Sequence, residues 1–232
     1  MNRLLASLAL CAAAGAASAA PQLAMPGENF HGDEVPARDG ESWFALVVAG
    51  GKAHLQSTRL RVEAVNDPIM DGPDDRTGRS VAAAGIEARV FLRGIAALKS
   101  GEIPVAVAEP TALSATEPLA VRLGDATLRL VPHCADSGDE SGGLACTVGL
   151  NDGTSEQTLF TTYGARENGV VQFGDVPPTV LFAGDLDRDG RLDLIIDTTD
   201  HYNLSRPTLF LSGAAKTGEQ VAETAQQQIS GC

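Results

Sequence analysis

The sequence predicts an all-β protein with an antiparallel β-sandwich or barrel-like fold. Apolar and polar residues alternate with a period of two in several short segments, and turn residues separate these segments at intervals of roughly 8–12 residues. No long segment shows the 3.6-residue apolar period of an amphipathic helix. We therefore expect a single β-rich domain over residues 41–232, with a strand–loop–strand unit near its C-terminus at 180–212.

The N-terminus has the features of an export signal. Arg3 provides a positive charge, residues 4–17 are apolar, and Ala17-Ser18-Ala19 is a small-residue cleavage site. The apolar run is shorter than the roughly 20 residues that span a bilayer, so no membrane span is expected. We predict that residues 1–19 are a cleaved signal peptide and that the protein is periplasmic or secreted.

Residues 20–40 are rich in proline, glycine and charge, which predicts a flexible leader. Regular structure is expected from Ser42 onward. The clearest alternation places Leu60, Val62 and Ala64 between polar neighbours. The segments predicted as strands are 43–48, 53–65, 87–92, 103–107, 119–123, 126–131, 146–150, 157–163, 170–173, 179–182, 192–196 and 207–212. The polar tail over 216–230 could form a short helix or a last strand, and a strand is favoured.

Turn residues add detail to this prediction. Gly124-Asp125 is a two-residue hairpin turn between neighbouring strands. Pro104 lacks a backbone N–H and should place its strand at a sheet edge. Residues 66–80 form a predicted loop whose aspartates are either a second cation site or, as we favour, a solvated turn; these residues are Asp67, Asp71, Asp74 and Asp75.

One short segment has the chemistry of a calcium site. Residues 184–196 read GDLDRDGRLDLII, with carboxylates at Asp185, Asp187 and Asp189 and a fourth at Asp193. Calcium takes several oxygen ligands at once, and this alternation lets successive carboxylates converge on one point. Gly190 permits the sharp turn that the loop needs. An acidic surface turn without a ligand is the alternative, but four carboxylates so close together repel one another.

Two further features describe this loop. The backbone carbonyl of Arg191 is a candidate ligand, which would leave its positive side chain free to point away from the ion. An EF-hand would need a glutamate at the twelfth loop position and helices on both sides, but Ile196 occupies that position. The flanking segments are rich in bulky apolar residues, so strands are expected instead.

The run GDLDRDGRLDLIID resembles the calcium loop of FG-GAP or VCBS-type repeats, which occur in integrin-like β-propellers and in secreted bacterial proteins. The resemblance covers about residues 180–212, and the chain contains one copy. It implies calcium as cofactor. The ligands that it implies are Asp185, Asp187, Asp189, the carbonyl of Arg191, and Asp193.

Charge and cysteines limit the possible partners. The formal net charge of -13 argues against nucleic-acid binding, because such a protein repels a polyanion. Cys11 would be removed with the signal peptide, and three cysteines would remain. A disulfide is plausible in an exported chain. Cys134 and Cys146 bracket a polar loop and are the simplest pair, while Cys232 could pair with either of them or with another chain.

The sequence supports two functional hypotheses. The first is an exported, non-enzymatic calcium-binding protein that serves as an interaction or structural module, with another protein or a cell-surface component as its partner. The second is a secreted or periplasmic hydrolase with a structural calcium site. Asp200 and His201 are its candidate acid–base pair, although turn residues are the commoner role for such a pair. No catalytic residue is assigned.

Overall fold

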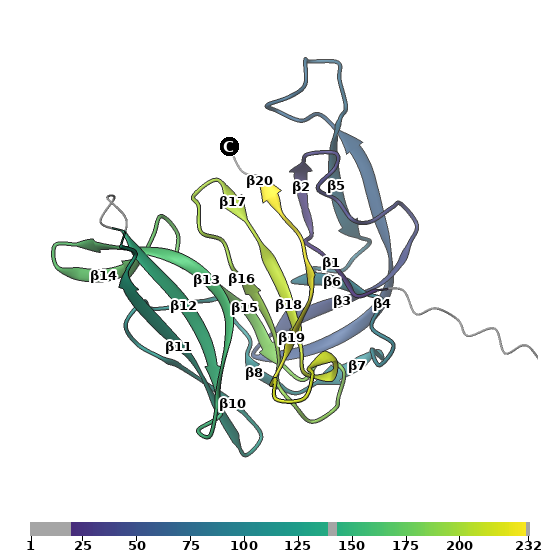
Figure 1. Ribbon diagram of the computed structural model, residues 1–232. Coiled ribbons are helices and arrows are strands. Elements are labelled where there is room, and N and C mark those ends of the chain that lie inside the picture. The colour runs from purple at the N-terminus through teal and green to yellow at the C-terminus, as the bar shows by residue number, and fades with distance from the viewer. Residues whose placement is uncertain (1–19, 139–142, 231–232) are drawn as a thin grey trace, which may run out of the picture.

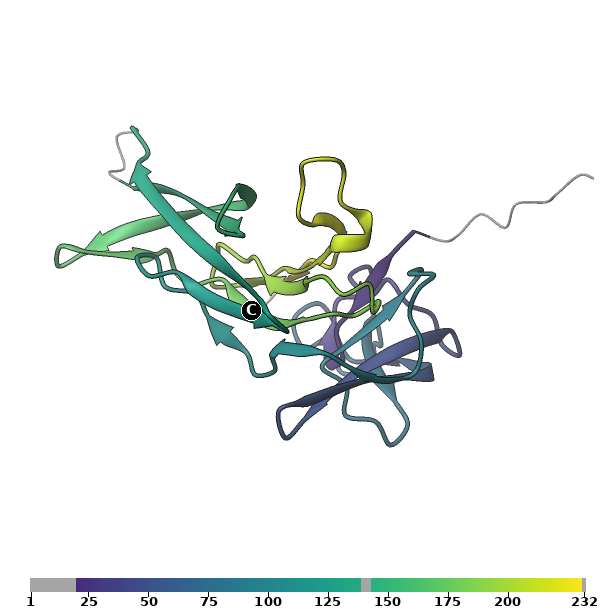
Figure 2. The same cartoon turned by 90° about the horizontal axis from the view of Figure 1, so that it is seen from below.

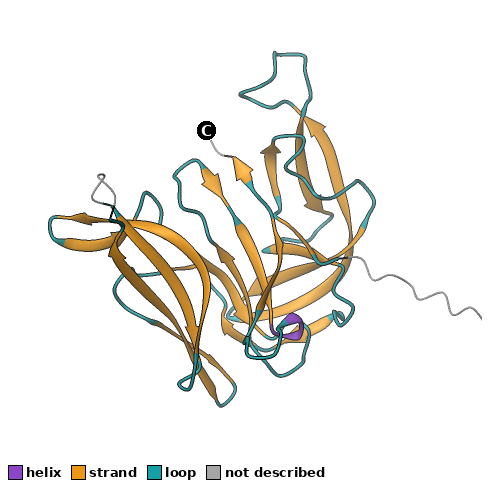
Figure 3. Ribbon diagram, viewed as in Figure 1, coloured by secondary structure: helices purple, strands orange, loops and turns teal. Residues whose placement is uncertain are grey.

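The computed structural model describes residues 20–138 and 143–230, and these residues are almost entirely β-strands (Figures 1 and 3). The helical content of this described part is one 3₁₀ turn, η1, over Ser212–Ala214. The predicted all-β class is therefore confirmed, with curled antiparallel sheets. The predicted signal peptide, Cys11 and Cys232 lie outside the described residues.

The N-terminal sheet has seven strands in the order β1-β6-β3-β4-β5-β2, with β7 paired to β4. Its strands are β1 (Gln22–Ala24), β2 (Gly27–Phe30), β3 (Ser42–Ala49), β4 (Lys52–Val65), β5 (Gly78–Ala83), β6 (Val90–Arg93) and β7 (Gly101–Ile103). The long strand β4 pairs with β3, β5 and β7, so it joins the curled halves of this sheet.

A five-stranded meander follows, in the order β10-β11-β12-β13-β14. Its strands are β10 (Leu119–Leu123), β11 (Ala126–Asp136), β12 (Leu144–Asn151), β13 (Glu156–Glu167) and β14 (Val170–Phe173). The predicted turn at Gly124-Asp125 joins β10 to β11, and Gly124 has the positive φ of 56° that such a turn requires. The disulfide lies within this sheet: Cys134 and Cys146 face each other across β11 and β12, with their Cα atoms 4.1 Å apart.

The third sheet, called the central sheet below, is built mostly from the last quarter of the chain. Its order is β19-β18-β16-β15-β8, and β9 also pairs with β15. Its strands are β8 (Val105–Val107), β9 (Thr111–Ala112), β15 (Thr179–Gly184), β16 (Asp193–Asp197), β18 (Pro207–Leu211) and β19 (Ala222–Gln226). A short ladder of β17 (Leu204–Ser205) and β20 (Ile229–Ser230) completes the chain.

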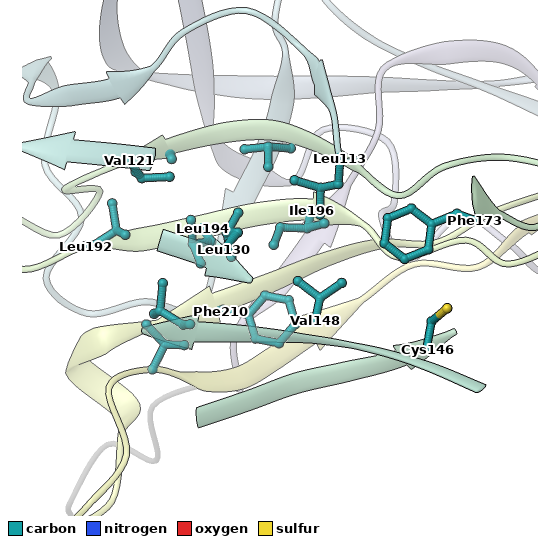
Figure 4. Close-up of a cluster of buried hydrophobic side chains, with 14 of the residues drawn as sticks. Leu113, Val121, Leu130, Cys146, Val148, Phe173, Leu192, Leu194, Ile196 and Phe210 are labelled. Carbon is teal, nitrogen blue, oxygen red and sulfur yellow. The ribbon is translucent and has the colours of Figure 1, made fainter. Parts of the chain in front are cut away.

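The central sheet lies between the other two sheets (Figures 1 and 2). Successive side chains of a strand point to opposite faces, so Leu194 and Ile196 pack on the meander while Ile195 packs on the N-terminal sheet. Figure 4 shows the first of these two cores, where Val121 and Leu130 of the meander meet β16 and β18. Strand β18 is buried along its whole length because both of its faces are covered.

The structure differs from the prediction where distant segments pair. Within the predicted flexible leader, Gln22–Ala24 pairs with β6 and Gly27–Phe30 pairs with β5. Leu23 and Ala24 are fully buried there, a tertiary contact that the local composition does not indicate. The predicted loop over 66–80 ends earlier, because β5 begins at Gly78.

Proline chemistry is seen as expected. The predicted strand over 103–107 is divided at Pro104 into β7 and β8, which pair with different sheets. Strand β8 is an edge of the central sheet, in agreement with the missing N–H of Pro104. The tail that could be helix or strand forms the strands β19 and β20. Among the described residues, no helix has the length and apolar character needed to cross a membrane.

Candidate metal centre

The predicted calcium loop connects β15 to β16, two adjacent strands of the central sheet. Gly184 and Asp193 are the last residue pair of the β15–β16 ladder, so the loop begins and ends where these strands are fixed. Strand β18 pairs with β16 on the other side, and η1 follows β18 directly. The loop therefore lies at the end of the sheet where Ser212 can reach it.

Three carboxylates converge in this loop. Carboxylate oxygens of Asp185, Asp187 and Asp193 all lie within 4.8 Å of one another. Asp185 is 4% exposed and Asp193 is fully buried. We call these three residues the carboxylate cluster. Buried carboxylates are rare without a compensating charge, and no Lys or Arg forms an ion pair with any member of the cluster within the described chain.

The loop backbone holds Asp185 in place. Its two oxygens accept hydrogen bonds from the backbone N–H groups of Asp189 and Gly190, each with an N···O distance of 3.0 Å. This loop conformation requires a left-handed backbone at Gly190, where φ is 83°, and also at Arg188, where φ is 61°. Glycine adopts that conformation readily, whereas arginine does so at a cost that other contacts must offset.

The side chain of Arg188 supplies such contacts. Its guanidinium donates to the carbonyl oxygen of Lys99 at 2.8 Å and to that of Glu102 at 3.1 Å. These bonds fix the loop to the segment that leads into β7 of the N-terminal sheet. The loop thus connects the central sheet to the N-terminal sheet through backbone acceptors.

Asp193 is held by two different segments. It accepts the backbone N–H of Leu186 at 2.8 Å, the backbone N–H of Ser212 at 2.8 Å and the Ser212 hydroxyl at 2.9 Å. Burial raises the pKa of Asp193 to about 7, and the nearby charge of Asp187 adds to the rise, although the Ser212 hydrogen bonds oppose it. A bound cation would favour the ionised form that burial disfavours.

Asp187 completes the cluster from the loop side. Burial raises its pKa, and the charges of Asp189 and Asp185 raise it further. Its Oδ2 points at Gly213, where an added methyl group would lie only 2.7 Å from that oxygen. Gly213 therefore leaves the room that the Asp187 carboxylate occupies.

Asp189 has a different environment from the other three. Its carboxylate forms an ion pair with Arg191, with an N···O distance of 2.8 Å, and accepts the Ser212 hydroxyl at 3.1 Å. Burial opposes its ionisation, but the hydrogen bonds from Arg191 and Ser212 outweigh burial and lower its pKa. The Arg191 side chain lies against Asp189. A ligand role for Asp189 and for the Arg191 carbonyl stays a prediction.

The carboxylate cluster fits a hard cation. Calcium–oxygen distances are about 2.3–2.6 Å, so two oxygens on opposite sides of one ion lie about 5 Å apart. The cluster oxygens all lie within 4.8 Å of one another, so one ion could contact all three. Three carboxylate oxygens in a largely buried position, with the nearby guanidinium of Arg191 paired to Asp189, suit calcium better than zinc, which typically takes nitrogen and sulfur ligands.

Sequence reasoning missed the residues that close the site from outside the loop. Ser212 and Gly213 lie on another segment, 19 and more positions after Asp193, and no motif marks them. Only the pairing of β16 with β18 brings them to the loop. Arg188 is inside the motif, but the sequence does not show that its side chain reaches Lys99 and Glu102.

The second acidic loop forms turns of its own. Asp67 is buried and pairs with His31, and it also accepts the backbone N–H groups of Ile69 and Met70. Asp71 accepts the N–H and hydroxyl of Thr77. Among the described residues, the group of metal-type side chains that converges is the carboxylate cluster, and these aspartates do not form another.

The candidate acid–base pair is not formed. The Asp200 carboxylate pairs with Arg206 at 3.2 Å, whereas Nδ1 of His201 contacts the side-chain oxygen of Asn203. The His201 ring also packs against Tyr202, with 4.5 Å between the ring centres. Neighbours in sequence here have separate partners.

No family model, curated protein or solved structure matches this chain. The fold and the site describe an all-β protein with a disulfide and a carboxylate cluster that could bind a metal ion. The resemblance of the loop to FG-GAP or VCBS-type repeats stays a prediction.

Proposed function

We propose that this protein is an exported calcium-binding β-protein that acts as a non-enzymatic interaction or structural module. The convergence of Asp185, Asp187 and Asp193 carries the proposal, because Asp185 and Asp193 are buried, and because burial and neighbouring carboxylates raise the pKa of Asp187 and of Asp193. A divalent cation is the simplest compensation for such an arrangement.

The position of the cluster favours a structural role for the ion. The loop connects two strands of the central sheet, and Asp193 also binds Ser212 after β18. An ion held there would join the loop, β16 and the β18–η1 junction. Binding to the folded state alone would stabilise the fold by mass action.

The expected affinity is modest. The loop lacks the bidentate glutamate of an EF-hand, so a dissociation constant of about 10⁻⁴ to 10⁻³ M, as in extracellular modules, is reasonable. Calcium at that affinity would be bound outside the cytoplasm, which agrees with the predicted signal peptide and with the Cys134–Cys146 disulfide.

The hydrolase hypothesis has less support. Its only named pair, Asp200 and His201, is directed to Arg206 and Asn203 respectively. A general base must be held within reach of the proton that it takes, and the carboxylate that would orient His201 has another partner. The interaction or structural role is therefore the proposal that we carry forward, with another protein or a cell-surface component as its partner.

Thermal melting of the mature protein with calcium, with magnesium and with chelator tests the proposal. Calcium should raise the melting temperature more than magnesium, because magnesium prefers a tighter octahedral site and gives up its waters reluctantly. Equal effects of the two ions would overturn calcium selectivity.

Two single substitutions locate the ion. Asp187→Ala should abolish the calcium response. Asp74→Ala removes the same charge from the exposed loop between β4 and β5, and should leave the response intact. If Asp187→Ala melts with the full calcium shift, the ion binds elsewhere.

A further inference from the structure

A concave, mostly apolar cavity lies beside the candidate metal centre. Its volume is about 320 Å³, which is at the small end of the range for small-molecule sites. The calcium loop forms one side through Gly190, Arg191 and Leu192, and the β10–β11 hairpin forms the opposite side. The cavity therefore lies between the central sheet and the meander.

The floor of the cavity is buried and apolar. Leu150, Leu192 and Val221 line it, with exposed fractions between 0% and 4%. Leu192 and its neighbour Leu194 belong to the core of Figure 4, so the floor is continuous with the packing between the two sheets. The floor is consequently packed against the core between the two sheets.

The mouth of the cavity is formed by the hairpin. Leu123 and Leu128 are half-buried there, and Ala126 is exposed. Ala126 pairs with Leu123 across β10 and β11, so the two side chains point to the same face of the hairpin. Half-buried leucines at an opening leave apolar surface that a small molecule could cover.

The charged groups of the lining already have partners. Arg191 is paired with Asp189, and Asp152 accepts hydrogen bonds from Thr154 and Ser155 in its own turn. An anionic or cationic ligand would find no unpaired opposite charge in this lining. Charge balance and the leucine-rich walls therefore favour a neutral, largely apolar ligand, and the buried Oε1 of Gln220 in the same lining, which has no hydrogen-bond partner among the described residues, offers it one acceptor.

We propose that this cavity binds a small neutral apolar molecule and that the calcium loop forms one of its walls. Binding removes the leucine surfaces at the mouth from water, which supplies the driving force. Because Gly190–Leu192 belongs to the loop that the ion orders, calcium should also tighten ligand binding; this dependence on calcium rests on the proposed function. The coupling is reciprocal, so the ligand should tighten calcium binding by the same factor.

The probe for the test is N-phenyl-1-naphthylamine, a neutral apolar dye whose emission rises in apolar surroundings. Its fluorescence is titrated against the mature protein in calcium and in chelator. We expect saturable binding that is several-fold tighter in calcium. Ala126→Trp should weaken dye binding at least about tenfold, because the indole fills the mouth and takes the place of the dye against the leucines there.

Ala120→Trp is the matched control. Ala120 lies on β10 of the same hairpin and pairs with Arg129, on the face opposite to Ala126. The Ala120→Trp variant should bind the dye as tightly as the unmodified protein does. If no dye binds in either buffer, or if Ala126→Trp binds as tightly as Ala120→Trp, the cavity proposal is overturned.

Two measurements separate this proposal from the proposed function. If calcium fails to raise the melting temperature while dye binding still depends on Ala126, the calcium function fails and the ligand site stands. If calcium raises the melting temperature but dye affinity is equal in both buffers, the coupling is overturned. Sedimentation velocity should give a monomer; a dimer that Ala126→Trp dissociates would mean that a second copy fills the cavity, and would overturn the proposal.

Discussion

Replacing Asp187 with asparagine should stabilise the protein in chelator and remove most of the stabilisation that calcium gives. Asparagine keeps the shape of the side chain, and its carbonyl oxygen can still accept the N–H of Asp189, as Asp187 does at 3.2 Å. Its amide group can face the other two carboxylates and donate to them. The substitution therefore removes one charge from the carboxylate cluster with little change in packing.

Without calcium, the loss of charge should stabilise the protein. Two unit charges 4.8 Å apart repel by about 3 kcal/mol at an effective dielectric of about 20 and by about 1 kcal/mol in water. Asp187 is half-buried, so a gain of about 1–2 kcal/mol is expected in chelator. For a domain of this size that corresponds to an increase of about 2–8 °C in melting temperature.

With calcium, the advantage of the variant should disappear, and it should reverse if calcium binds at the tighter end of the expected range. At about 10 mM calcium and a dissociation constant of about 10⁻⁴ to 10⁻³ M, binding stabilises the unmodified protein by about 1.4–2.7 kcal/mol. Asp187→Asn should lose most of that gain. Differential scanning calorimetry of both proteins in calcium and in chelator measures the four melting temperatures. If the asparagine variant is less stable in both buffers by the same amount, Asp187 has a packing role and the electrostatic reasoning is refuted.

Three further predictions follow from other contacts. Replacing Cys134 and Cys146 together by serine should lower the free energy of unfolding by about 3 kcal/mol, measured by urea denaturation, because the disulfide no longer restricts the unfolded chain. Finding both thiols free in the non-reduced protein would contradict this. The hydrogen bond between His31 and Asp67 raises the pKa of His31 above 6.5 and lowers the pKa of Asp67 below 3.8. The pair therefore stabilises the fold between about pH 3.8 and pH 6.5, and this contribution is lost as pH rises through the folded pKa of His31. Accordingly, His31→Gln should destabilise the protein more at about pH 5.5 than at about pH 9. If the substitution shifts the urea unfolding midpoint equally at both pH values, the pair does not contribute as described. Gly213→Ala should raise the calcium concentration needed for half of the melting shift, since a methyl group there meets Asp187, whereas Ala214→Gly in the same turn should leave it unchanged.

The sequence predicted the local features of the fold well. Alternation located β4, the Gly124-Asp125 pair located a hairpin, and Pro104 correctly indicated an edge strand. These features depend on neighbours in sequence. What alternation could not show is that the central sheet is covered on both faces, because Leu194, Ile195 and Ile196 form a short apolar run that several structures would suit.

The candidate site was predictable only in part, for the same reason. The loop motif contains the three residues of the carboxylate cluster, but the position of Asp193 also depends on Ser212, which β18 brings to it. The same serine and Arg191 contact Asp189, which does not belong to the cluster. Similarly, His31 and Asp67 are 36 positions apart and meet through the N-terminal sheet, a contact without a sequence signature.

The placement of the central sheet determines when this chain can fold. Strands β3, β4 and β6 lie early in the chain, yet the apolar face of Leu46 and Leu55 is covered by Phe182, Ile195 and Leu209 from its last quarter. During synthesis, the apolar face of the early strands stays exposed to solvent until the late strands have been made. Such long-range pairing is slow and leaves the chain open to aggregation. The folding yield should therefore be higher when the chain is kept unfolded until its late strands have been made.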